Sequence, residues 1–170
     1  MRASLVISVI AAISLNLLGV FPVDAQMMDK SGGNIVDFLP QNPAECAPDG
    51  IANGGYDLVS YRKEGGPKPG SSEFPADFGG MTYLFESEAH RDKFQADPER
   101  YLPAYSGWCA VTLALGRLIC PDYTNFKIED DQLLLFELTG FTNGQTLWDS
   151  DVGRFRGQAN DNYSIVIDFE

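Results

Sequence analysis

Hydrophobic and polar positions alternate over short stretches of this chain, a pattern typical of strands that bury one face. Residues 56–61 alternate bulky side chains with small or polar ones and predict a short strand or extended segment. Residues 74–78 and 81–85 flank Gly79-Gly80, and such a pair supplies the positive φ angles that a two-residue turn needs. The pattern therefore predicts a first β-hairpin over residues 74–85.

Helix signals follow directly after this hairpin. Ser87 is a suitable N-cap, because its hydroxyl accepts a hydrogen bond from a free N–H of the first turn, and it predicts a helix over residues 88–96. Asp97 and Pro98 then restart the chain for one further helical turn over residues 99–102, with Pro98 at the first helical position.

An apolar run and a second hairpin come next. Residues 108–115 are mostly apolar and end at Gly116, which favours a helix with a glycine C-cap over a strand. Residues 126–129 alternate, Asp130-Asp131 marks a turn, and residues 132–137 are largely apolar. This order predicts a second β-hairpin.

The C-terminal part of the chain adds two expected elements. We expect a short amphipathic helix over residues 147–155 and a strand-like segment over residues 163–169. Hairpins and helices interleave without regular βαβ spacing, which predicts an α+β fold. The expected architecture is a small domain with two β-hairpins and short helices packed on one side.

The first 25 residues have the layout of a secretory signal peptide. Arg2 is followed by an apolar run over residues 3–20, and Val23-Asp24-Ala25 places small residues at a cleavage site. A membrane anchor is the alternative, but the run is near the lower length limit for a bilayer span, and a polar, Gly-rich stretch follows it. Cleavage after Ala25 predicts a periplasmic or secreted protein that does not contact the membrane once the signal is removed.

The remaining chain divides into an arm and a domain. Residues 26–53 are rich in Pro and Gly and predict an extended N-terminal arm, with one apolar patch at residues 35–39 that we expect to dock on the domain. Residues 54–170 form one domain with a C-terminal extension, long enough to bury a core.

The charge of the chain argues against nucleic-acid partners. The net charge is −12, with 24 acidic and 12 basic residues. Binding to a phosphate backbone needs clustered Lys and Arg, and the sequence has no such cluster.

The cysteines permit one disulfide. An exported chain meets an oxidising compartment, so pairing among Cys46, Cys109 and Cys120 is allowed, and an odd number leaves one thiol over. The simplest assignment joins Cys46 to Cys120 and leaves Cys109 buried and free, although the sequence leaves the connectivity open.

Several segments, taken in order, carry a family resemblance: residues 55–61, 80–85, 94–101, 107–110 and 126–136, with Trp148 and Ala159-Asn160. Together they resemble the YHS-domain family, and most closely its exported branch. The match spans about residues 54–160, and the resemblance implies a small α+β domain and metal handling. In the cysteine-rich version of the family, thiols fall at positions that correspond here to Ser60, Glu86 and His90, so that thiolate site is absent.

The lone histidine is the first candidate metal ligand. His90 lies four residues after Glu86, a spacing that puts two side chains on one helix face, although Glu86 precedes the predicted cap. We expect His90 and Glu86, together with Asp57 or Cys109, to bind a divalent transition metal such as Cu, Zn or Ni. Each residue also has a structural interpretation: an exposed helix position for His90, a turn cap for Asp57, and core packing for Cys109.

These features predict an exported, non-enzymatic binding domain that holds a divalent transition metal or a small ligand. The alternative is a structural or protein-interaction domain without a cofactor. A Cys-dependent enzyme is a third hypothesis, which requires Cys109 to lie beside His90 as its base.

Overall fold

A computed structural model describes residues 46–47 and 49–167. The predicted signal peptide over residues 1–25 and most of the predicted arm, including its apolar patch, lie outside these residues. Within the described part of the chain, no helix has both the length and the apolar character needed to cross a bilayer.

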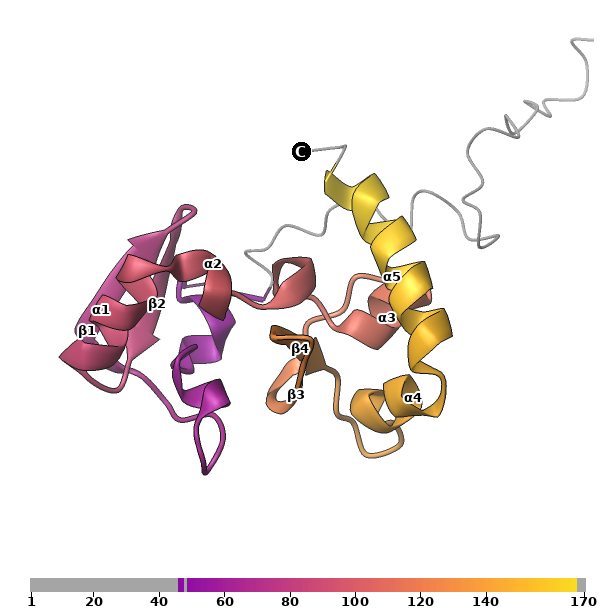
Figure 1. The fold of residues 1–170 in the computed structure, drawn as a ribbon, viewed down its shortest axis with the longest axis horizontal. Helices are drawn as coiled ribbons and strands as arrows, with labels where there is room; N and C mark the ends of the chain where they lie inside the picture. The colour runs from indigo at the N-terminus through magenta and orange to yellow at the C-terminus, as the bar shows by residue number, and fades with distance from the viewer. Residues whose placement is uncertain (1–45, 48, 168–170) are drawn as a thin grey trace, which may run out of the picture.

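Two antiparallel hairpins organise the fold and confirm the α+β class (Figure 1). The first consists of β1 (Ser71–Phe78) and β2 (Met81–Phe85), and the second of β3 (Asp122–Glu129) and β4 (Gln132–Phe136). Both two-residue turns have positive φ: 58° and 78° at Gly79-Gly80, and 52° and 60° at Asp130-Asp131. This left-handed backbone matches the twist of the strands, which explains why both hairpins were predictable.

Helices pack against each hairpin. The predicted Ser87 cap is confirmed, because the Ser87 hydroxyl accepts a hydrogen bond from the His90 N–H at the start of α1. The apolar run 108–115 contains a helix, as predicted, and Gly116 follows it with φ 79°. The helices are α1 (Glu88–Ala96), α2 (Pro98–Tyr101), α3 (Ala110–Ala114), α4 (Gly144–Ser150) and α5 (Val152–Ile167), with 3-10 turns η4 (Ala52–Gly55), η5 (Ser60–Arg62) and η6 (Ala104–Gly107).

Two expected elements are wrong. Residues 56–61 are not a strand, because the Asp57 carboxylate accepts a hydrogen bond from the Val59 N–H and folds the chain into a turn that leads into η5. The strand expected over residues 163–169 is instead largely part of α5. The single helix expected over residues 147–155 is divided between α4 and α5, with the break at Asp151.

Strand β4 lies between two hydrophobic cores. Its residues Leu133 and Leu135 pack with Leu58, Phe85 and Phe94 in what we call the first core. The intervening Leu134 and Phe136 pack with α3, α4 and α5 in the second core. The side chains of residues 133–136 are all at most 1% exposed, which explains the uninterrupted apolar run, because side chains alternate between the two faces of a strand. Figure 1 shows β3 and β4 between the first hairpin and the helices α3, α4 and α5.

Candidate metal centre

Three segments bring Asp57, Glu86 and His90 together. Asp57 precedes the turn into η5, Glu86 follows the last residue of β2, and His90 lies in the first turn of α1. One ligand atom from each residue lies within 4.8 Å of the others, and this is the one such group of three or more potential ligands in the part of the chain described by the structure. Asp57 and His90 are 0% and 3% exposed, so the prediction of an exposed histidine is wrong.

The Asp57 carboxylate has three hydrogen-bond partners. Its Oδ1 accepts from the Val59 N–H at 2.8 Å, and its Oδ2 accepts from the Glu86 N–H at 3.0 Å. The same Oδ2 lies 2.5 Å from His90 Nδ1. Asp57 therefore caps a turn, as its structural interpretation predicted, and also contacts the imidazole.

Both ring nitrogens of His90 contact a charged side chain. An ionised carboxylate only accepts hydrogen bonds, so Nδ1 carries the proton that it donates to Asp57. On the other side of the ring, the Lys63 Nζ contacts Nε2. An ammonium group only donates, so Nε2 accepts from Lys63. The ring is thus held between a buried carboxylate and an exposed lysine.

Glu86 is the most accessible member of the group. Its side chain is 29% exposed, and its Oε1 lies 3.3 Å from His90 Nδ1. Its other oxygen lies 3.8 Å from Lys68 Nζ, an exposed side chain. The group thus carries two carboxylates, which the ammonium groups of Lys63 and Lys68 partly balance.

The geometry is compatible with a metal after one local adjustment. Two ligand atoms about 2.0–2.1 Å from a tetrahedral metal lie roughly 3.3 Å apart. Glu86 Oε1 and His90 Nδ1 already have this separation of 3.3 Å. The 2.5 Å between Asp57 Oδ2 and Nδ1 is a hydrogen-bond length, so a metal that takes both atoms must replace the shared proton and widen the pair.

Cys109 does not belong to this group, which corrects its inclusion among the expected ligands. It is 0% exposed and packs in the second core, whereas Asp57 and His90 adjoin the first. Burial raises the pKa of the Cys109 thiol, and hydrogen bonds from Thr112 and from the Glu137 N–H do not offset this effect. A raised pKa keeps the sulfur in the thiol form, which is neither a nucleophile nor a metal ligand.

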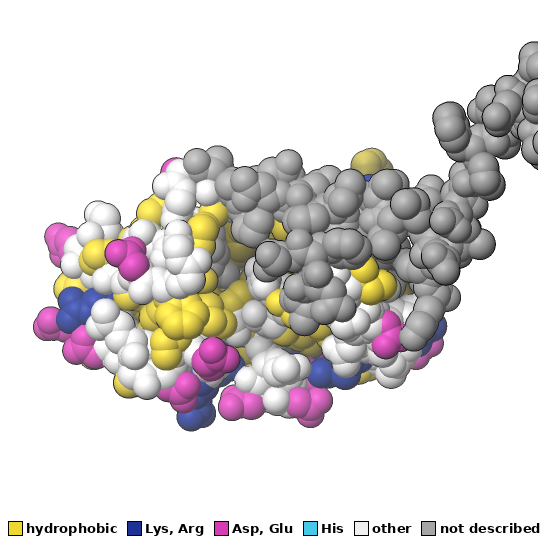
Figure 2. Space-filling view, turned by 90° about the horizontal axis from the view of Figure 1, so that it is seen from above, with side chains coloured by type: hydrophobic (Ala, Val, Ile, Leu, Met, Phe, Trp, Pro, Cys, Tyr) yellow, Lys and Arg dark blue, Asp and Glu magenta, His cyan; other side chains and the backbone are white. Residues whose placement is uncertain are grey.

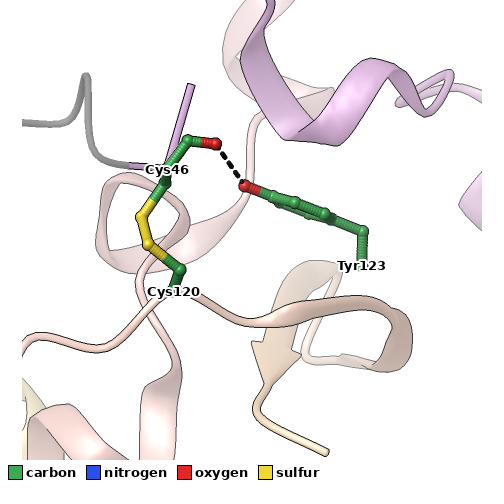
Figure 3. Close-up of a disulfide and its surroundings, with 3 residues drawn as sticks. All are labelled: Cys46, Cys120 and Tyr123. Atoms are coloured by element: carbon green, nitrogen blue, oxygen red, sulfur yellow. Dashed lines mark hydrogen bonds between the residues drawn. A yellow bond between two sulfur atoms is a disulfide. The ribbon is translucent and has the colours of Figure 1, made fainter. Parts of the chain in front are cut away.

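The other two cysteines form a disulfide. Cys46 and Cys120 are joined across 74 residues of sequence, and the Tyr123 hydroxyl donates to the Cys46 carbonyl (Figure 3). Cys109 is the free cysteine of the described chain. This is the pairing that the sequence favoured.

Sequence reasoning missed Lys63, whose contact with His90 depends on the path of the chain after η5. It also gave no role to Ser60, whose buried hydroxyl donates to the Asp57 carbonyl and accepts from the Lys68 N–H. Ser60 thereby holds the backbone that carries Asp57. No periodic pattern marks either residue.

Comparisons with protein-family models, with curated proteins and with solved structures found no match to this chain.

Proposed function

We propose that this protein is an exported, non-enzymatic binding protein that holds one divalent transition metal between Asp57, Glu86 and His90. The observation that carries the proposal is the convergence of three potential ligand atoms within 4.8 Å, one of them, from Asp57, contributed by a segment 33 residues before His90. The predicted signal peptide and the resemblance to the exported YHS branch support it, and they suggest a periplasmic or secreted location.

The donor set favours certain metals. One imidazole nitrogen and two carboxylate oxygens suit Zn²⁺, Ni²⁺ and Cu²⁺, whereas Cu⁺ prefers the thiolates that the site lacks. For a site of fixed donors, affinity rises toward Cu²⁺ in the first-row series. We therefore expect Cu²⁺ to bind more tightly than Zn²⁺ or Ni²⁺.

Metal binding requires Lys63 to move. A metal held at Nδ1 would leave the ring proton on Nε2, and an Nε2–H group cannot accept from an ammonium. Lys63 is exposed, so its side chain has room to leave the ring. The positive charge of the ion then replaces the lysine charge as the balance for the two carboxylates.

Titration of tag-free mature protein, starting at Gln26, with Cu²⁺, Zn²⁺ and Ni²⁺ by isothermal calorimetry tests the proposal. Glu86→Gln removes one ligand charge at a partly exposed position, so we expect it to fold and to bind at least tenfold more weakly. Glu88→Gln is the matched control, because Glu88 lies two residues further along the chain, is 71% exposed and is outside the ligand group. Equal weakening by both variants would indicate non-specific attraction to an acidic surface.

One observation favours a second function, a structural or interaction domain without a cofactor. The Asp57 carboxylate already has three hydrogen-bond partners, so the Asp57–His90 pair can act simply as a clamp between the turn before η5 and helix α1. Under this alternative none of the three metals binds above the level of the Glu86→Gln variant.

A further inference from the structure

A groove lies between the first hairpin and the segment over residues 103–108, separate from the Asp57–His90 group. It encloses about 570 Å³ and adjoins a smaller recess of about 80 Å³. Figure 2 shows hydrophobic side chains gathered toward the middle of one face of the molecule. The groove and the recess share the lining residues Met81, Tyr83, Pro103, Ser106 and Trp108.

The lining of the groove mixes apolar and polar groups. Trp108 and Tyr105 are 5% and 8% exposed, so each presents only a small part of its ring. The apolar surface that a partner can reach comes mainly from half-buried side chains such as Phe78, Met81 and Tyr83. A peptide suits such a lining, because it carries polar backbone groups between its apolar side chains.

The N-terminal part of the chain joins the described domain beside this groove. Cys46 and Ala47 line the recess. The disulfide to Cys120 fixes Cys46 in this place, and the Cys46 carbonyl accepts a hydrogen bond from the Tyr123 hydroxyl (Figure 3). The residues that precede Cys46 in the sequence are therefore attached next to the recess and the groove.

The attached residues contain one pronounced apolar run. Four of the five residues over 35–39, Ile-Val-Asp-Phe-Leu, are apolar. Outside this run and the Pro40 that follows it, residues 26–45 have no more than two consecutive apolar side chains. Apolar side chains gain free energy when they leave water, so this run favours contact with a partly apolar surface.

The linker between the apolar run and the domain is short. Residues 40–45 separate Leu39 from Cys46, so their Cα atoms lie at most about 25 Å apart. Pro40 and Pro43 restrict the linker backbone, which lowers the entropy lost on docking. A short tether gives a local concentration on the order of millimolar, so the docked state requires only a modest intrinsic affinity.

The charges along the groove are compatible with this run. Glu99, Arg100 and Asp131 line the groove, and Asp131 is paired with Arg62 at 3.6 Å. Arg100 is exposed and offers a cationic partner to Asp37, the single charged residue of the run. One carboxylate is therefore accommodated at the groove.

From the position of Cys46, the apolar run and its short linker, we infer that residues 35–39 of the chain's own N-terminal arm dock in the groove. Their apolar side chains cover Met81, Tyr83 and Pro103, and Asp37 lies near Arg100. The groove is thus occupied by the chain itself. It shares no residue with the metal ligands, so this inference stands or falls independently of the proposed function.

Site-specific photo-cross-linking of the mature protein, starting at Gln26, tests the docking directly. p-Benzoylphenylalanine replaces Phe38, which keeps an aromatic ring in the run. In the matched control it replaces Met28, an apolar residue of the same arm outside the run. After irradiation, mass spectrometry maps the cross-linked peptides. We expect cross-links from position 38 to residues 78–83 or 102–108, with a yield at least about fivefold higher than from position 28.

A mixture of ¹⁵N-labelled and unlabelled protein identifies the occupant of the groove. Cross-links within one chain carry a single isotope, whereas cross-links between copies join labelled to unlabelled peptides. The inference is overturned if the groove cross-links join different copies, or if cross-links from position 38 fall outside the groove. It is equally overturned if they are no more frequent than those from position 28.

A second measurement uses natural side chains only. Phe38→Ser with Leu39→Ser removes two apolar side chains of the run, and Met27→Ser with Met28→Ser removes two outside it. Neither pair changes a residue in the part of the chain described by the structure. We expect ¹H–¹⁵N amide shifts over residues 103–108 in the first variant alone, with the amides of α4 unchanged in both. Unchanged amides over residues 103–108 in the first variant would overturn the inference.

Discussion

The two cores of this protein bury titratable groups in opposite ways. Beside the first core, Asp57 and His90 are buried together, and each provides the other with a charged or polar partner. In the second core, Cys109 is equally buried but lies among apolar side chains, and its contacts leave the pKa of its thiol raised. The comparison teaches that burial alone does not create a chemical site. A site needs several buried groups that hydrogen-bond or pair with one another, so that these contacts offset the cost of removing each group from water.

The largest contrast is expected in stability. Asp57→Ala leaves the buried imidazole and the N–H groups of Val59 and Glu86 without their acceptor, which should lower the free energy of unfolding by about 3–5 kcal/mol. Cys109→Ala removes one buried sulfur and should cost only about 1–2 kcal/mol. Urea unfolding of both variants measures the difference, and similar losses would contradict the contrast.

The disulfide gives the next largest effect. It closes a long loop between Cys46 and the chain before β3, across 74 residues of sequence. Replacing Cys46 and Cys120 together by Ala should destabilise the protein by roughly 2–4 kcal/mol, because the unfolded chain gains freedom. Urea unfolding provides the measurement. Wild type under reducing conditions should match the double variant, and a stability unchanged by reductant would contradict a structural role for the disulfide.

The reactivity of Cys109 sharpens the comparison further. Because burial raises the pKa of its thiol, we expect iodoacetamide to label native protein far more slowly than protein unfolded in urea. The thiolate fraction grows as pH rises toward the raised pKa, so any native labelling should increase steadily into the alkaline range. Mass spectrometry at several pH values measures the rates. Rapid native labelling at neutral pH would revive the hypothesis of a Cys-dependent enzyme.

The smallest effect concerns Lys63. Its ammonium faces His90 Nε2 and opposes the tautomer that a metal at Nδ1 requires, so Lys63→Met should raise Cu²⁺ affinity roughly two- to fivefold. Lys93→Met removes the same charge from an exposed position on α1 and provides the control in the same calorimetric titration. Weaker binding by Lys63→Met alone would show that the lysine supports the site.

Local signals made much of the fold predictable. Gly79-Gly80, Asp130-Asp131 and the Ser87 cap each act within a few residues, so the sequence reveals both hairpins and α1 directly. The strand expected over residues 56–61 failed because one side-chain hydrogen bond, from the Val59 N–H to Asp57, outweighed the alternating pattern. The strand expected over residues 163–169 failed because packing of α5 on α3 decides that segment.

The candidate site was predictable only in part, because only one of its contacts joins residues that are close in the sequence. Glu86 and His90 are four residues apart, so their proximity is visible in the sequence. Asp57 and Lys63 reach His90 from 33 and 27 residues away, through tertiary structure. Cys109 was a candidate by residue type alone, and packing places it in the other core.

The central claim is that His90 is a metal ligand, and electron paramagnetic resonance tests it most directly. His90 is the single histidine of the chain, so any imidazole coupling in the Cu²⁺ spectrum of tag-free protein identifies it without ambiguity. We predict a one-to-one Cu²⁺ complex with pulsed-resonance modulation from one imidazole, which disappears in His90→Phe and persists in Glu88→Gln. A bound Cu²⁺ spectrum without imidazole coupling, or no bound Cu²⁺ at all, would contradict the account.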